Sequence, residues 1–563
     1  YSRSVNSELT DDEILAITSN AWQLVGEPKY SRTVKQISDT TTIILWTATV
    51  EVNVDDFEIQ SWIKRDDKDK SQIITQTRET LKASEENDKK IEDLREKYNR
   101  ATSQAEKDNL IKQMNDAERD FLANQKLEEG LKLYYAKDYQ GAIKLYDEAL
   151  KFGEYEGVYN NRGLAYGHLE QYERAIQDFD KAIQINPNFA EAYNNRGNAY
   201  SDLGQNERAI KDYDKAIELN PNYATFYYNR GFAYVKLEKY EMAIQSLNKA
   251  IELNTNYVNA YNNRGVAYKN LGQYEQAIKD FNKVIEINSN DVDAYINRGT
   301  VYNHLKQNEL AIQDFDRAIQ LNPDYEIAHY NRGSLYNDLG QNEQAIQDFD
   351  KAIQLNPNYD KAYNNRGLTY ADLGKYDQAI QDYTKAIEIN PNNADAYINR
   401  GIAYYYFKQY DLVIQDFDKT IQINPNYTKA YYNRGTVYVN LKQYDQAIQD
   451  FNKAIELNPN YVNAYYNRGN SYRYMKQYER AIQDYTKVIE LDPNNASAYN
   501  NRAVAHNLLY NFNQAIDDAT KAIQLDPNKA TAYRIRGLAY HQLREEAKAQ
   551  ADFAKAKELG YNG

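Results

Sequence analysis

Small and apolar residues recur along most of the chain with a fixed period of 34 residues. The tripeptide Asn-Arg-Gly marks this period, and Arg502 and Arg536 extend its series, followed by Ala503 and Gly537. Within one unit, residues 190–221, the apolar and small residues step by three and four, which predicts two amphipathic helices joined near Gly204. The arginines of the complete tripeptides stand at 162, 196, 230, 264, 298, 332, 366, 400, 434 and 468.

Proline marks the end of each unit. Nine of the ten prolines occupy one repeat position, at 187, 221, 323, 357, 391, 425, 459, 493 and 527. Proline cannot donate a backbone hydrogen bond and restricts the residue before it, so each of these prolines is predicted to follow the end of a helix.

The repeat resembles the tetratricopeptide repeat (TPR) in the spacing of its aromatic, small and proline residues. One unit shows this at Tyr193, Gly197, Tyr200, Ala209, Tyr213, Ala216 and Pro221. Twelve units of 34 residues begin at residue 156, and a divergent unit of 33 residues, 123–155, precedes them. The resemblance implies a mainly all-α fold, a right-handed TPR superhelix (α-solenoid) of about 13 helix pairs over residues 123–563.

The unit departs from the family where the family usually has leucine, since this chain has arginine in all twelve units. The residue 16 positions later is aspartate in eleven of them, and Ser246 is the exception. A buried guanidinium needs a partner, so we expect structural ion pairs, for example Arg298 with Asp314 or Asp280, and Arg332 with Asp348. A phosphate-binding stripe of arginines is disfavoured because the matching aspartates would neutralise it.

Asparagine occupies the position before this arginine in eleven units. With the arginine as position 7, the resemblance implies that positions 2, 5, 6, 9, 12 and 13 line a concave groove. The position-6 asparagines and the position-5 tyrosines are the candidate groove residues. They are Asn161, Asn195, Asn229, Asn263, Asn297, Asn331, Asn365, Asn399, Asn433, Asn467 and Asn501, with Tyr228, Tyr330, Tyr432 and Tyr466.

A carboxamide both donates and accepts hydrogen bonds, which suits the backbone of an extended peptide. The column is similar to the asparagine ladder in the TPR superhelix of O-linked N-acetylglucosamine transferases. The structural alternative is that each asparagine bonds a neighbouring helix. A carboxylate clamp for chaperone tails is not expected, because lysine stands at position 2 only in Lys361 and Lys429.

Residues 1–65 have no repeat and hold all three tryptophans, Trp22, Trp46 and Trp62. They are expected to form a small α+β module with a helix to about Val25, strands at 33–36 and 42–54, and a helix at 55–65. The module resembles, on few residues, N-terminal modules of exported bacterial envelope proteins such as flagellar assembly protein T. That resemblance implies a bacterial envelope or exported location, with a cytoplasmic one as the alternative.

Residues 66–122 are rich in charge and lack proline and glycine. Their apolar spacing predicts a helical, coiled-coil-like linker, made of two helices folding back near 102–107 or of one long helix with a register break. The first residue is Tyr1, so we expect a fragment or a processed product. Polar replacements in the last unit, Gln550 and Lys557, suggest a terminal cap.

The composition of the chain argues against several classes of function. The 563 residues carry a net charge of −14, with 55 tyrosines, five histidines and no cysteine. A nucleic-acid binder normally shows a basic excess, no apolar run is long enough for a membrane-spanning helix, and no catalytic or cofactor motif or metal-ligand spacing occurs. Neither an enzyme, nor a cofactor, nor a metal is expected.

The favoured function is a non-catalytic scaffold that binds extended segments of partner proteins in the groove. One alternative is a structural spacer or surface-displayed solenoid whose specificity lies in the N-terminal module. Another is the targeting arm of a separate enzyme.

Overall fold

The computed structural model describes residues 29–38, 41–49, 82 and 86–561. Strands β1 (Lys29–Ser38) and β2 (Thr41–Thr49) form an antiparallel hairpin with Arg32 opposite Trp46. These strands contain the expected strand at 33–36 and most of the expected strand at 42–54. The helices expected before Val25 and at 55–65 lie outside the described residues.

The linker folds back on itself. Residues 86–100 are helical, the chain turns at residues 101–103, and α4 (Gln104–Tyr135) begins at an N-cap where the Ser103 hydroxyl accepts from the Glu106 N–H. Leu94, Ala101, Leu110 and Ala117 form the core between the two helices. Of the two alternatives, the structure has the two helices that fold back. The expected boundary at 122/123 lies inside α4, whose C-terminal half packs on α5 (Tyr139–Ala149) as the first repeat.

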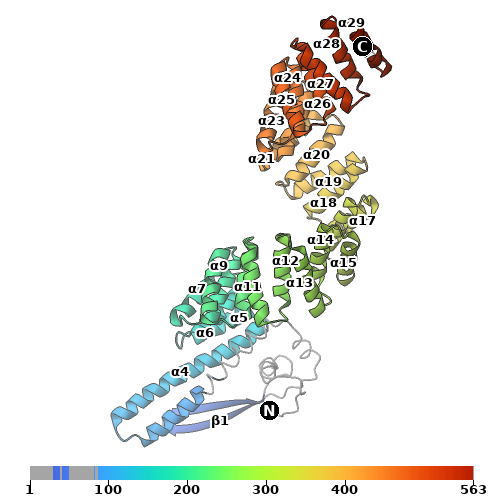
Figure 1. Cartoon of the computed structure of the whole chain (residues 1–563). Helices are drawn as coiled ribbons and strands as arrows, with labels where there is room; N and C mark the ends of the chain where they lie inside the picture. Colours follow the sequence, from blue (N-terminus) through green and yellow to red (C-terminus); the bar gives the residue numbers. More distant parts are fainter. Residues whose placement is uncertain (1–28, 39–40, 50–81, 83–85, 562–563) are drawn as a thin grey trace. The chain divides into compact units, whose positions relative to one another are not determined.

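The rest of the described chain is a series of antiparallel helix pairs, visible in Figure 1 from cyan to red. The chain divides into two compact units, 1–301 and 302–563, and the division falls within α14 (Val292–His304). The other helices of the first unit are α6 (Glu156–His168), α7 (Tyr172–Ile185), α8 (Ala190–Asp202), α9 (Asn206–Leu219), α10 (Ala224–Lys236), α11 (Tyr240–Leu253), α12 (Val258–Asn270) and α13 (Tyr274–Ile287).

The second unit continues the same arrangement to the C-terminus. Its helices are α15 (Asn308–Leu321), α16 (Glu326–Asp338), α17 (Asn342–Leu355), α18 (Asp360–Asp372), α19 (Tyr376–Ile389), α20 (Ala394–Tyr406), α21 (Tyr410–Ile423), α22 (Thr428–Asn440), α23 (Tyr444–Leu457), α24 (Val462–Tyr474), α25 (Tyr478–Leu491), α26 (Ala496–Leu508), α27 (Phe512–Leu525), α28 (Ala530–Gln542) and α29 (Glu546–Glu558). Even-numbered helices are the first of each repeat and odd-numbered helices the second.

Small residues let the two helices of a repeat approach closely. In α22 a Cβ on Gly435 would lie 2.8 Å from Cε1 of Phe451, which is fully buried on α23. The same glycine–aromatic contact recurs in most repeats. One repeat replaces both members, with Ala503 on α26 and Ala519 on α27, and both are fully buried. The combined size of the residue on the first helix and its partner on the second helix therefore sets the distance between the two helices of a repeat.

The turns between helices explain why glycine and proline recur at fixed positions of the repeat. The second residue after each first helix adopts positive φ, as in Gly374 (φ 72) and Lys442 (φ 60). The strain of this conformation, about 1 kcal/mol for a residue with a side chain, accounts for glycine at several of these positions. The second helices end before Asn-Pro-Asn segments. There the first asparagine side chain accepts from the backbone N–H two residues on, as between Asn424 and Asn426.

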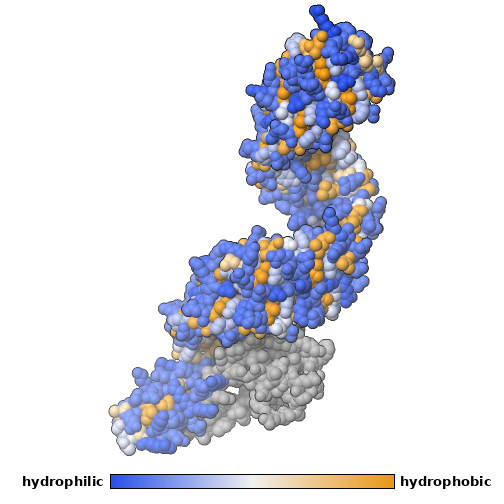
Figure 2. All heavy atoms as spheres, in the orientation of Figure 1, coloured by the Kyte–Doolittle hydropathy of each residue, from blue (hydrophilic) through white to orange (hydrophobic). Residues whose placement is uncertain are grey.

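Figure 2 shows a mostly hydrophilic surface on the visible face of the repeats, with apolar residues in narrow strips between polar ones. The largest fully buried side chains are aromatic residues of the second helices, such as Phe349 and Phe451. The core of each repeat therefore lies between its first and second helices.

Candidate functional site

The asparagines at position 6 lie on the first helices and are brought next to position 5 of the preceding repeat. We call the surface made by these two columns the asparagine face. Asn161, Asn195 and Asn229 are buried and the other position-6 asparagines are half-buried. The first helices of successive repeats contact each other directly, for example α6 with α8 and α18 with α20. The asparagine face therefore follows the successive first helices of each unit.

Most of these amides bond across the repeat boundary. In eight cases the Nδ2 of the asparagine donates to a position-5 side chain 35 residues earlier, over 2.8–3.3 Å. The acceptor is the Oδ1 of an asparagine or the hydroxyl of a tyrosine. The donor–acceptor pairs are Asn195–Asn160, Asn229–Asn194, Asn263–Tyr228, Asn297–Asn262, Asn365–Tyr330, Asn399–Asn364, Asn467–Tyr432 and Asn501–Tyr466.

These bonds leave some donors and acceptors of the position-6 carboxamides unused. In three repeats the Oδ1 also accepts from the neighbouring position-5 asparagine, which closes the network at Asn195, Asn365 and Asn501. The Oδ1 atoms of Asn229, Asn399 and Asn467 accept from no other residue that the structure describes. Since each carboxamide also has a second N–H, the column retains both donors and acceptors.

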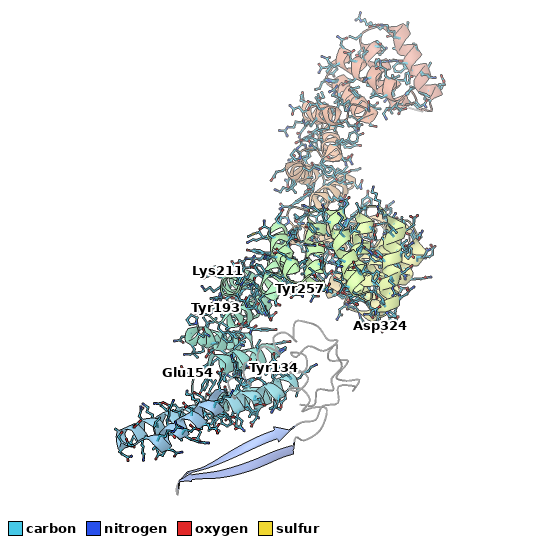
Figure 3. The ribbon with its side chains drawn as sticks, turned by 60° about the horizontal axis from the view of Figure 1, so that its bottom comes forward. Tyr134, Glu154, Tyr193, Lys211, Tyr257 and Asp324 are labelled. Atoms are coloured by element: carbon cyan, nitrogen blue, oxygen red, sulfur yellow. The ribbon has the colours of Figure 1, made fainter. Side chains whose placement is uncertain are left out.

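Three of the position-5 tyrosines that accept these hydrogen bonds are themselves held by contacts with other tyrosines. Tyr228, Tyr330 and Tyr432 each pack against a tyrosine at the end of the same repeat, with ring centroids 4.9 Å apart. One of these partners, Tyr257, is labelled in Figure 3. Burial raises the pKa of Tyr330 above its ordinary value. The Tyr330 phenol therefore stays neutral and serves as a hydrogen-bonding group at physiological pH.

The arginine column is a set of structural clamps. Arg332 donates from Nε and Nη2 to the two carboxylate oxygens of Asp348, at 2.8 and 2.7 Å, and joins α16 to α17. Its Nη1 donates to Asp316 of the preceding repeat at 2.5 Å. The pattern recurs from Arg162 to Arg536, and Arg230 bonds the hydroxyl of Ser246 instead. Arg298 and Asp314 belong to different units, so their pairing stays a prediction.

Burial and the arginine charge have opposite effects on the pKa of the aspartate in each arginine clamp. Burial raises the pKa of the Asp450 carboxyl, and the bonds from Arg434 offset only part of that effect. The side-chain exposure is 18% for Arg434 and 6% for Asp450. A guanidinium with three atoms already bonded to the protein has little capacity left for a phosphate ligand.

The third bond of each arginine was not predicted. Its acceptor lies about 16 residues before the arginine, on the second helix of the preceding repeat, and it is Asp, Asn or Thr wherever the bond is described. The sequence did hold a signal, because this column contains only residues with an acceptor oxygen. The expected partner in the preceding repeat was instead an aspartate of the other column, Asp280 for Arg298, and the structure pairs Asp280 with Arg264 of its own repeat.

Among the described residues, no group of three His, Asp or Glu side chains is arranged to hold a metal ion. No described helix is long and apolar enough to cross a membrane. His329 replaces the usual position-4 tyrosine and contacts Asp348 through Nδ1 at 3.3 Å and the Pro323 carbonyl through Nε2 at 3.1 Å. That histidine therefore belongs to the arginine clamp.

Curated relatives match only short parts of the chain. Sperm-associated antigen 1 of Rattus norvegicus is 30% identical over 79 residues, which are 14% of this chain and 9% of that protein. Small glutamine-rich tetratricopeptide repeat-containing protein 2 of Mycosarcoma maydis is 38% identical over 71 residues, 12% of this chain and 20% of that protein. The matched segments thus span a small fraction of these relatives.

Solved TPR structures align with parts of the chain. The crystal structure of MamA is 28% identical and covers 29% of this chain and 94% of its own, with a TM-score of 0.28. The structure of YrrB, described as a TPR protein with an unusual peptide-binding site, is 29% identical. It covers 33% of this chain and 95% of its own, with a TM-score of 0.27.

Family models match the repeats directly. The tetratricopeptide repeat model matches residues 158–189, 258–291, 292–325, 360–393, 394–427, 428–461 and 462–495. Two further TPR models match 197–238, 233–272 and 333–374, and 179–211, 315–347 and 484–517. Together these segments cover residues 158–517 without a gap. With the helix pairs described above, they show that the chain belongs to the tetratricopeptide repeat family, whose members are generally non-catalytic scaffolds for protein–protein interaction.

Proposed function

We propose that this scaffold holds extended segments of partner proteins along the asparagine face. The observation that carries the proposal is the repeated, half-buried carboxamide with an unused acceptor, as in Asn399 and Asn467. A peptide backbone offers an N–H and a C=O at each residue, and a column of amides can bond it whatever its side chains are. The flanking tyrosines add flat contact area that costs little conformational entropy.

The cross-repeat bonds support this role. Eight of the eleven amides are held in one orientation by a bond to the preceding repeat, so binding a peptide immobilises few additional side chains. A bond of this kind contributes on the order of 1 kcal/mol. Several in a row are therefore needed for useful affinity, which suits a repeating column.

The structural spacer is the second candidate. The eight cross-repeat bonds favour it, because the asparagines stabilise the stacking of repeats whether or not a ligand is present. The two functions predict different results when the unused acceptors are removed, and that difference defines the experiment.

The experiment is a selection of random 16-residue peptides, displayed on phage, against the full chain. The binders are then measured by fluorescence anisotropy against a variant of the second unit with Asn399→Ala, Asn433→Ala and Asn467→Ala. We expect a loss of affinity of roughly 100-fold or more, at about fivefold for each lost bond. Asn426→Ala, in an exposed turn away from the asparagine face, is the matched control and should bind like the parent.

Circular dichroism checks that both variants are folded. Peptides that bind the triple variant as tightly as the parent, or a parent that enriches no peptide, would overturn peptide binding on this face and favour the spacer.

A further inference from the structure

Helix α20 carries apolar or aromatic side chains at all three of positions 9, 12 and 13, which face the same side of the first helices. Ile402, Tyr405 and Tyr406 stand at positions 9, 12 and 13 and are 40%, 36% and 59% exposed. Their spacing of three and four residues places them on one side of the helix. In the other eleven 34-residue repeats at least one of these positions is polar. We call these three residues the α20 patch.

Neighbouring repeats hold the α20 patch in place. The ring of Tyr406 stacks on Tyr376 of the preceding repeat, with centroids 4.2 Å apart. The Tyr405 hydroxyl accepts from Nδ2 of Asn440 on the following repeat at 2.7 Å. Exposed aromatic rings fixed in this way lose little freedom when a ligand covers them, and such rings are frequent anchors of interfaces.

The asparagine column is interrupted beside this patch. Position 5 of α20 is Ile398, which has no acceptor for the next asparagine, Asn433 on α22. The carboxamide of Asn433 makes no side-chain hydrogen bond with any other residue that the structure describes, and it is half-buried. A half-buried amide without a partner is unfavourable unless a ligand or water bonds it. Asn433 therefore offers both its donors and its acceptor next to an apolar surface.

A positive charge lies two repeats further along. Arg473 on α24 occupies position 12, in line with Tyr405 and Val439. Its Nε is buried and has no hydrogen-bond partner, and its guanidinium carbon lies 4.7 Å from the ring centroid of Tyr474. Within the described part of the chain, no carboxylate lies at ion-pair distance from this guanidinium. A carboxylate from a ligand would complement its charge.

We infer that the second unit selects an extended peptide that carries a large apolar side chain for the α20 patch and an acidic side chain for Arg473, with its backbone bonded to Asn433. This rests on the proposed function and names its ligand class. Helices in contact are about 8–10 Å apart, so two repeats correspond to roughly 20 Å. At about 3.3 Å per extended residue, the two side chains should be about six residues apart.

To test this inference, the phage library of random 16-residue peptides is selected on the full chain and, separately, on the variant Ile402→Ser/Tyr406→Ser. The selected peptides are then sequenced. We expect the parent to enrich Leu, Ile or Phe five to seven residues from Asp or Glu, and the variant to lose the apolar preference. A selected peptide should bind the variant at least tenfold more weakly. Leu412→Ser, at a 38% exposed residue of α21 in the same repeat, is the matched control and should change nothing.

A second variant, Arg473→Gln, should remove the acidic preference and make the affinity less dependent on salt concentration. Peptides that bind without the apolar–acidic spacing would overturn this inference and leave the proposed function standing. A parent that enriches nothing would overturn both. Sedimentation equilibrium tests whether a second copy of the chain, instead of a peptide, covers the α20 patch. A dimeric parent together with a monomeric Ile402→Ser/Tyr406→Ser variant would show that it does.

Discussion

At the scale of single residues, most repeats depend on an arginine that makes three bonds. The guanidinium joins the two helices of its own repeat and the second helix of the preceding one, as Arg434 does with Asp450 and Asp418. A buried charge is tolerated only while it is paired and hydrogen-bonded. The arginine therefore carries both the helix pairing and the stacking of repeats.

The repeat with serine in place of aspartate offers an internal comparison. Replacing Arg434 by glutamine leaves the buried Asp450 carboxylate without its partner and should lower the free energy of local opening by about 3–5 kcal/mol. Replacing Arg230 by glutamine leaves the hydroxyl of Ser246, a neutral group, and should cost about 1–2 kcal/mol. Hydrogen exchange of the amides of α22–α23 and α10–α11 measures the two losses. Equal losses would show that the buried carboxylate is not the cause of the difference.

His329 changes the acid–base behaviour of one clamp. Burial raises the pKa of Asp348, but hydrogen bonds from Arg332 and His329 outweigh it and hold the pKa below its ordinary value. The pKa of Asp450, whose clamp has an arginine and no histidine, is raised. Ionised Asp348 thus stabilises the fold above the ordinary carboxyl pKa, and this contribution is lost as the pH falls through the lower folded-state value.

The variant His329→Tyr restores the usual residue of position 4. We expect the pKa of Asp348 to rise above its ordinary value, so that its ionised form no longer favours the folded state. The measurement is a carboxyl carbon NMR titration, with Asp348→Asn to assign the signal. An unchanged pKa in the variant would mean that Arg332 alone sets it.

At the scale of helix pairs, the packing distance depends on one glycine and one aromatic residue. Gly435→Ala places a methyl group against Phe451 and should cost about 1–3 kcal/mol by overpacking. Phe451→Ala alone leaves a cavity and should cost about 3–5 kcal/mol. The double variant reproduces the natural pair Ala503 and Ala519, so it should cost less than the sum of the two.

Hydrogen exchange of α22 and α23 in the two single variants and the double variant gives the coupling energy of this cycle. Additive losses would contradict the steric explanation. Gly374→Ala serves as a comparison, because its Cβ meets no atom and its cost comes only from the positive φ.

At the scale of the whole molecule, stability is distributed over many interfaces between neighbours. The arginine clamps and the asparagine bonds each connect only adjacent repeats. Such an array does not unfold as one cooperative unit, and its stability is a sum of repeat and interface terms. A point variant should therefore act on its own repeat and the ones beside it.

Two spectroscopic probes should separate the parts of the chain during unfolding in urea. All three tryptophans lie within residues 1–65, whereas the helical signal comes mostly from the repeats. We expect different midpoints for tryptophan fluorescence and for circular dichroism at 222 nm, and a broad helical transition. Coincident, sharp transitions would indicate one cooperative structure.

The sequence by itself determined the period, the helix pairs and the ends of the helices. These features follow from local rules: three- and four-residue spacing sets an amphipathic helix, proline ends it, and glycine tolerates positive φ. It also identified the asparagine and arginine columns, because residue types repeat at fixed positions. The linker was predicted only as two alternatives, since a register break and a fold-back share one apolar pattern.

Only the tertiary structure decided which atoms these columns bond. The partner of Asn399 is 35 residues earlier and the third partner of Arg332 is 16 residues earlier, both across a repeat boundary. No local pattern encodes such a contact, because it depends on how one helix pair stacks on the next. The same stacking leaves Asn433 without a partner beside the exposed residues of α20. That combination exists only once the consecutive first helices α20 and α22 are placed side by side.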